Sequence, residues 1–199
     1  MWKAVEFDEA ARERIKKAGK HEKSLRLSAY LGALTDIGPC SLRPLTPRHV
    51  VELEYAENHI AVGGECDSSD VAHYCWLLRP EGEKRDQVGL VKDVALAFAK
   101  DPTLAQSIAK HFSMSFIDVP AGSKSDSNIV NSQVWLSPLI DCLASEYAWG
   151  LESIMDTPLG VSFQLLQLVF KRRFGKKYSL QNPLTQKAMA QEMGRMTNE

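Results

Sequence analysis

The stretch PLGVSFQLLQLVFKRRF, residues 158–174, indicates most clearly which fold this sequence adopts. Its apolar residues recur at intervals of three and four, which is the repeat of one face of an α-helix. They form two stripes: Leu159, Phe163, Leu166 and Phe170 in the first, and Val161, Leu165, Leu168 and Val169 in the second. A helix that is apolar on most of its faces is usually buried. The stretch therefore predicts a helix in the core of a helical domain.

One of the two stripes could instead contact a partner or another copy of the chain. Under that alternative the candidate partner-binding residues are Trp149, Leu159, Phe163, Leu166 and Phe170. The helix is expected to end at Lys171-Arg172-Arg173, because cations suit the negative end of the helix dipole, with Gly175 as the terminator. Burial in the core and contact with a partner are both open for this segment.

Signals for further helices lie along the rest of the chain. Thr46-Pro47, Asp101-Pro102 and Thr157-Pro158 each place a capping side chain before a proline, and Ser68-Ser69-Asp70 offers another start. The cap oxygen accepts a backbone N–H that has no partner within the helix, and proline at the first helical position loses no hydrogen bond. Each of these sites predicts the start of a helix.

Apolar spacing supports these helices and suggests two more. The aligned sets are Val71, Cys75 and Leu78 in residues 69–79, Leu90, Val94 and Phe98 with flanking Val91 and Ala95 in residues 86–100, and Leu104, Ile108 and Phe112 in residues 102–117. Residues 4–19 are expected to form a charged, exposed helix that ends near Gly19, and residues 23–36 another, closed by Gly38-Pro39. Alternating β-branched runs are not evident, so strands should be few or absent.

These signals predict an all-α fold, a single helical domain over residues 1–199 with about seven to nine helices. Residues 119–128 have the composition of a flexible loop, and this loop is expected to join two helical halves, 1–118 and 129–199. Hydrophobic residues at 44% and charged residues at 25% are ordinary for a globular domain. A chain of 199 residues can bury a core without cross-links.

The cysteines and the start of the chain bear on its compartment. Cys40, Cys66, Cys75 and Cys142 are irregularly spaced and include no Cys-x-x-Cys pair. The first residues lack the apolar stretch of a signal peptide, and no segment approaches the ~20 apolar residues that span a bilayer. We expect a reduced cytoplasmic protein that makes no contact with membranes.

The formal net charge of −1 hides an uneven distribution. Residues 1–30 carry eight basic and five acidic side chains (+3), residues 171–199 carry seven and two (+5), and residues 31–170 carry nine and eighteen (−9). Basic ends on an acidic body could bind nucleic acid, could contact the body of a neighbouring copy to give a homo-oligomer, or could simply be solvated. Aromatic residues do not interleave the basic runs as a base-stacking platform requires, so we do not expect nucleic-acid binding.

The sequence offers little catalytic chemistry. It contains no Gly-x-Ser-x-Gly elbow, no Gly-x-x-x-x-Gly-Lys phosphate loop and no Gly-x-Gly-x-x-Gly turn. His59, Cys66, His73 and Cys75 lie within seventeen residues, but His73 and Cys75 are two apart on a predicted helix and point in different directions. We therefore expect no enzyme activity, no metal and no cofactor. The tryptophans are expected to pack in the core, although an exposed one would anchor a protein partner.

Two stretches resemble a known kind of protein. Residues 45–53 (LTPRHVVEL), Gly63-Gly64 and residues 70–80 (DVAHYCWLLRP) are similar to small helical proteins encoded among the tail genes of siphophages and prophages. The pattern of those proteins is Leu-Thr-Pro-x-His, an apolar helix, a glycine turn, Asp-Val-Ala and Leu-Trp-x-x-Ser-Pro. Trp149-Gly150 and residues 154–159 (IMDTPL) resemble the Trp-Gly and Met-Pro-Leu elements of tail-assembly chaperones. The chain departs from the pattern at Arg79, where the family has Ser, and at Asn58-His59-Ile60, where it has Pro-Phe.

The resemblance implies a non-enzymatic bacteriophage tail-assembly chaperone. Such a chaperone coats the helical tape-measure protein in the host cytoplasm until the tail tube polymerises around it, and apolar helix faces could shield the client's amphipathic helices. The alternative is a structural protein of the virion, such as a connector or tail component, which stays in the finished particle. An enzyme or a DNA-binding regulator is a third reading.

Overall fold

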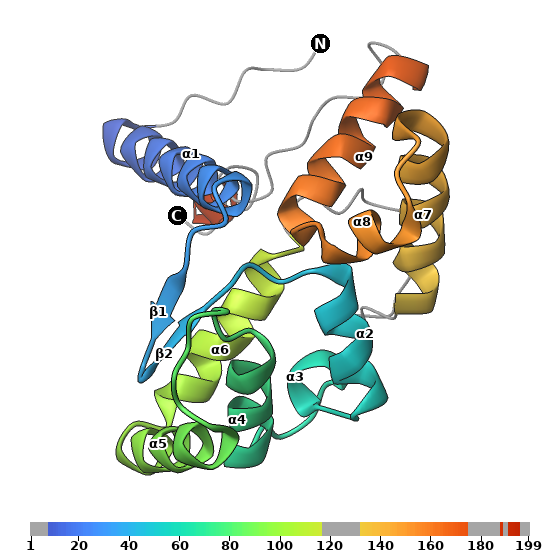
Figure 1. The fold of residues 1–199 in the computed structure, drawn as a ribbon. Helices are drawn as coiled ribbons and strands as arrows, with labels where there is room; N and C mark the ends of the chain where they lie inside the picture. Colours follow the sequence, from blue (N-terminus) through green and yellow to red (C-terminus); the bar gives the residue numbers. More distant parts are fainter. Residues whose placement is uncertain (1–7, 117–131, 175–187, 189–190, 196–199) are drawn as a thin grey trace.

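Helices account for nearly all of the regular structure in this computed structural model, which describes residues 8–116, 132–174, 188 and 191–195 (Figure 1). The helices are α1 (Glu9–Tyr30), α2 (Pro47–Tyr55), α3 (His59–Val62), α4 (Ser68–Leu77), α5 (Gln87–Lys100), α6 (Thr103–Met114), α7 (Ser132–Tyr147), α8 (Leu151–Asp156) and α9 (Leu159–Phe174). Residues 191–195 add a further helical segment. The predicted all-α fold class is confirmed. The loop predicted at 119–128 lies outside the described residues.

The N-terminal region differs from the prediction of two helices at 4–19 and 23–36. A single helix, α1, runs from Glu9 to Tyr30, and the chain then forms a small antiparallel hairpin of β1 (Thr35–Ile37) and β2 (Cys40–Leu42). Gly19 does not end the helix, because a glycine inside a helix costs only about 1 kcal/mol relative to alanine. The prediction of a helix at 23–36 is wrong beyond Tyr30, where Gly32 adopts a left-handed φ of 61° and turns the chain.

The hairpin is fixed by a turn and by tertiary contacts. Gly38, with a φ of 55°, begins the two-residue loop that brings Ile37 opposite Cys40. The backbone N–H of Arg43 then donates to the carbonyl of Leu78, 2.8 Å away, which holds the end of β2 against the end of α4. Strands of only three residues carry too few side chains to show a period in the sequence, so the hairpin gives no clear signal.

The predicted helix starts agree closely with the structure, although the capping atoms differ in places. Thr46 caps α2 as predicted, and its partner in the capping box is His49, whose Nδ1 accepts from the Thr46 N–H at 3.2 Å. At α4 the cap is Asp67, one residue before the predicted Ser68, with Asp70 as its partner. Thr157 does not cap α9: its hydroxyl donates to the Ser153 carbonyl at the end of α8.

Residues from both predicted halves share one hydrophobic core, which runs from Cys40 to Val169. α9 packs against α7 and α1, and the N–H of Leu159 donates to the Leu45 carbonyl at 2.8 Å, so the start of α9 is tied to the entry of α2. An ion pair spans the same junction, because Arg48 of α2 contacts Asp156 of α8 at 2.6 Å. Figure 1 shows α7, α8 and α9 stacked beside α2 and α6.

Two histidines, the buried His49 and the half-buried His111, should make the stability of this core dependent on pH. Burial lowers the pKa of His111 to about 4, and burial together with the positive charge of Arg43 lowers the pKa of His49 to about 4, whereas an unfolded histidine titrates near 6.5. The unfolded chain therefore binds more protons between pH 6.5 and 4. The stabilisation is complete above pH 6.5 and is lost as the pH falls towards 4.

We expect the free energy of unfolding to fall by about 2 kcal/mol for each of these histidines between about pH 7 and pH 5, as measured by urea unfolding. His111→Gln removes one titrating group and keeps an acceptor for the Tyr74 hydroxyl, which lies 2.8 Å from His111 Nδ1. This variant should lose about half as much stability over that pH range as the wild type. His21→Gln, at an exposed position of α1, is the control. An unchanged pH slope in His111→Gln would contradict this account.

Candidate functional site

The predicted partner-binding stripe of α9 faces the core in this fold. Leu159, Phe163 and Leu166 are 0%, 1% and 5% exposed, and Phe170 is half-buried against the same cluster. Trp149 is also half-buried, with its ring 5.9 Å from that of Tyr147. Partner binding by this stripe stays a prediction, and it would require α9 to leave the core.

The second stripe of α9 is more accessible in part. Val161 and Val169 are buried, Leu165 is half-buried, and Leu168 is 41% exposed. One accessible leucine offers little surface for a partner, since specific interfaces need several apolar contacts around a buried centre. The larger exposed apolar surfaces lie on other helices.

A groove between α4 and α5 is the most promising such surface. Its volume is about 300 Å³, and its lining residues are Ser68, Ser69, Ala72, His73 and Trp76 of α4 and Gln87, Val91 and Ala95 of α5. The lining combines the apolar side chains of Ala72, Trp76, Val91 and Ala95 with the polar side chains of Ser68, Ser69, His73 and Gln87. Ligand and peptide sites commonly have this arrangement, an apolar floor with a few polar groups around it.

The helix α5 creates this groove because it has two apolar faces. The inner face carries Leu90 and Val94, which are 1% and 0% exposed in the core. The outer face carries Val88, Val91 and Ala95, of which Val88 is 76% and Val91 42% exposed. A helix that covers a core needs only one apolar stripe, so the outer stripe is available for another contact.

The indole of Trp76 is held in place at the edge of the groove. The guanidinium carbon of Arg79 lies 3.5 Å from the centre of the Trp76 ring, and Arg79 Nη1 also donates to the Trp76 carbonyl. Arg79 is the position at which the tail-protein pattern has Ser. The arginine therefore covers one face of the indole, a contact that a serine could not make.

The wall on the α4 side is fixed by contacts to α3. Asn58, which is 2% exposed, donates from Nδ2 to the Asp70 carbonyl at 2.9 Å, and the same nitrogen lies 3.4 Å from Nδ1 of His73. His59 contacts the other end of Asp70, with Nδ1 2.8 Å from Oδ2. The hydrogen bond to Asp70, together with the negative charge of Asp70, raises the pKa of His59. Through these contacts Asn58 and His59 join α3 to the α4 wall of the groove.

The four residues tested for metal binding do not form a site. His59 pairs with Asp70, and the thiol of Cys75 is buried beside that of Cys40. Burial raises the pKa of Cys66 to about 11, which disfavours the thiolate that a metal requires. Within the described part of the chain, no group of three or more His, Cys, Asp or Glu side chains is placed to hold a metal ion.

Comparison with protein families, with curated proteins and with solved structures yields no match for this chain. Of the helices in the described residues, none has the length and apolar character needed to cross a membrane.

Sequence reasoning identified Val91, Ala95 and Trp76 as apolar residues but did not assign them to a binding surface. A signal was present: Val88, Val91, Ala95 and Ala99 are spaced by three, four and four, which makes a second stripe beside Leu90 and Val94. What the spacing alone cannot tell is which stripe faces the core. That depends on how α4 and α6 pack against α5.

A matched pair of leucines on α9 tests whether the first stripe is core. Leu166→Ala should lower the free energy of unfolding by about 2–5 kcal/mol, because it leaves a cavity at a position that is 5% exposed. Leu168→Ala makes the same chemical change at a residue that is 41% exposed, and it should lower the free energy of unfolding by about 1 kcal/mol or less. Urea unfolding of both variants gives the comparison. Equal losses would show that α9 is not packed as described.

Proposed function

We propose that this protein is a non-enzymatic bacteriophage tail-assembly chaperone that binds an amphipathic helix of the tape-measure protein in the α4–α5 groove. The observation that carries the proposal is the exposed apolar face of α5, which meets Trp76 and Ala72 of α4 in one groove. On this proposal the protein acts in the host cytoplasm and needs no cofactor.

The resembling stretches support the proposal through their positions. Residues 45–53 supply the capped start of α2, where Thr46 and His49 bond reciprocally. Residues 70–80 supply most of α4, and with it Ala72, His73 and Trp76 of the groove. Part of the shared pattern thus builds the scaffold and part of it lines the groove, which is what a family of helix-binding proteins requires.

The chemistry of the groove suits a helical client. An amphipathic helix presents apolar side chains at intervals of three and four, and a groove between two helices receives such a row. A half-buried tryptophan is among the side chains that contribute most to protein interfaces. The hydroxyl groups of Ser68 and Ser69 and the side chains of His73 and Gln87 can bond to polar groups at the edge of the client.

Substitutions on α5 test the groove. Val91→Asp places a charge in the apolar groove and should weaken binding of a tape-measure fragment by at least about tenfold, because a buried unpaired charge is costly. Leu96→Asp is the control: it adds the same charge to the same helix at a residue that is 52% exposed and outside the groove lining. Binding is measured by co-purification and titration, and circular dichroism checks the fold.

The proposal predicts that Leu96→Asp retains the client and that Val91→Asp releases it while keeping its helical spectrum. If both variants bind the tape-measure fragment equally well, the binding site lies outside the groove. If the wild-type protein retains no tape-measure fragment and is found in finished virions, the chaperone proposal fails and a structural virion protein takes its place.

A further inference from the structure

α1 presents an unusual surface to solvent. Its inner side faces the protein through Ala11, Ile15, Ala18 and Ala29, which are buried or half-buried, while its outer side is exposed along its length. The outer stripe is spaced by three and four residues and consists of Glu13, Lys16, Lys20, Lys23, Leu27 and Tyr30. This stripe, which we call the α1 face, is mainly basic in its first half and apolar in its second half.

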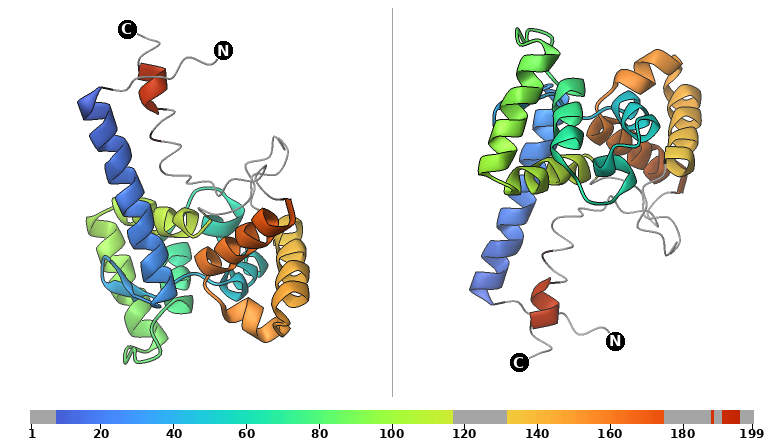
Figure 2. Two further views of the ribbon diagram at one scale, coloured as in Figure 1. Left: turned by 90° about the horizontal axis from the view of Figure 1, so that it is seen from above. Right: turned by 90° about the horizontal axis from the view of Figure 1, so that it is seen from below.

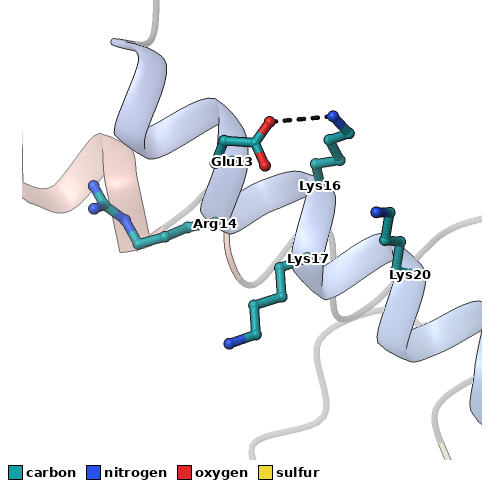
Figure 3. A pocket seen from close by; sticks show the side chains of 5 residues that line it. All are labelled: Glu13, Arg14, Lys16, Lys17 and Lys20. Atoms are coloured by element: carbon teal, nitrogen blue, oxygen red, sulfur yellow. Dashed lines mark hydrogen bonds and ion pairs between the residues drawn. The ribbon is translucent and has the colours of Figure 1, made fainter.

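The position of α1 is set by two contacts. Arg14 contacts the carboxylate of Glu192 through Nε and Nη2, both at 2.7 Å, so residues 191–195 hold the first half of the helix. Near the other end, a Cβ on Gly160 would lie 3.6 Å from the Cβ of Ala29, so α1 passes close to the start of α9. Figure 3 shows Lys16 and Lys20 pointing away from the helix on one side, while Arg14 points towards the C-terminal segment. A hollow of about 300 Å³ runs along these side chains.

The apolar half of the α1 face continues past the end of the helix. Leu27 and Tyr30 are 51% and 53% exposed, and Leu31 and Leu34 in the following turn are 80% and 50% exposed. Four large apolar side chains within eight residues are an exposed patch of the kind that marks a protein contact.

A second surface of the same chain has the opposite charge. Residues 51–67 contain five acidic side chains and no Lys or Arg. Glu52, Glu57 and Glu65 are exposed there, and so are Tyr55 at 91% and Val62 at 40%. We call this surface the acidic edge; it comprises the exposed residues between Glu52 and Glu65, at the end of α2, on α3 and in the segment that follows α3. It combines apolar groups with negative charge as the α1 face combines them with positive charge.

The two surfaces cannot satisfy each other within one chain. α1 packs mainly on α9, and Figures 1 and 2 show α1 on one side of the molecule and α2 with α3 on the other. We propose that the α1 face of one copy binds the acidic edge of a second copy, so that the protein associates head-to-tail. Such a contact joins two different surfaces and leaves one of each free at the ends, so it can extend beyond a dimer.

The basic and apolar groups have separate parts in this contact. Lys20 and Lys23 steer the α1 face towards Glu52, Glu57 and Glu65, because opposite potentials raise the rate of encounter and fix the orientation. The apolar groups around Leu31 and Tyr55 then lose contact with water, which supplies most of the affinity. Salt should weaken the association, since exposed charges are screened over about 10 Å at moderate ionic strength.

Charge reversal on each surface provides the test. Variant one carries Lys16→Glu, Lys20→Glu and Lys23→Glu, and variant two carries Glu52→Lys, Glu57→Lys and Glu65→Lys. The control carries Lys92→Glu, Lys100→Glu and Lys110→Glu, which make the same change in net charge as variant one at exposed positions of α5 and α6. Mass in solution is measured by light scattering after size-exclusion chromatography, over a range of protein and salt concentrations.

The wild type and the control should form species larger than a monomer at low salt, and variants one and two should each be monomeric. Mixing the two variants should restore the larger species, because each interface then joins opposite charges again. That rescue also shows that both variants are folded. Tyr55→Ala should weaken self-association about tenfold without lowering the melting temperature, because a side chain that is 91% exposed has little part in the fold.

Three results would overturn the proposal. One is a wild-type protein that stays monomeric at all concentrations. Another is an association that persists in both reversed variants, which would place the interface elsewhere. The third is the absence of rescue on mixing when circular dichroism shows both variants to be helical. Tape-measure binding is measured separately with Val91→Asp, so failure of self-association and failure of the groove are distinguishable.

Discussion

Four aromatic rings hold together the described segments that precede and follow residues 117–131. Phe112 lies in the last turn of α6 and Phe116 just after it, Trp135 lies in α7 and Phe163 in α9, and neighbouring ring centres are 5.2–5.9 Å apart. Aromatic groups in these tilted and edge-on arrangements contribute beyond the area that they bury. The cluster positions α9 so that its first stripe, from Leu159 to Phe170, packs in the core. For this reason the surface open to partners lies on α5 and α1, not on the helix with the most apolar sequence.

The parts of the fold that sequence predicts well are those decided within a few residues. Thr46-Pro47 marks the start of α2 because the cap and the proline are adjacent, and the stripe of Leu104, Ile108 and Phe112 faces the core because it holds three of the large apolar side chains of α6 on one face. The failures have other causes. The strands of the hairpin are too short to show a period, and the bond from Arg43 that holds the end of β2 reaches Leu78, far along the chain. Gly19 remains helical because a single glycine inside a helix costs only about 1 kcal/mol.

The candidate site, too, has features that the local sequence predicts and others that depend on tertiary packing. Periodicity places Val91 and Ala95 on one side of α5, and it places Trp76 on α4, but it does not bring them together. Their meeting depends on the close packing of α4 on α5 and on the bonds from Asn58 that fix α4 against α3. The stacking of Arg79 on Trp76 is a further tertiary effect, since three residues of separation permit the contact but do not require it. From the sequence alone, the groove is therefore visible only as a second apolar stripe on α5 that has no assigned partner.

The fold keeps the basic and acidic surfaces of the chain apart. A basic helix could lie against the acidic surface of its own chain, and the net charge would then be neutralised internally. Instead α1 packs mainly on α9, whose last turn carries Lys171, Arg172 and Arg173. Two of these cations, Arg172 and Arg173, are paired with Glu146 of α7. The positive α1 face and the acidic edge thus remain separated on one molecule, and only another molecule can bring them together.

Self-association and client binding can strengthen each other. If a long helical client occupies the groove of each copy, head-to-tail contact places successive grooves at regular intervals along that client. Each bound copy then raises the local concentration of binding sites for the next.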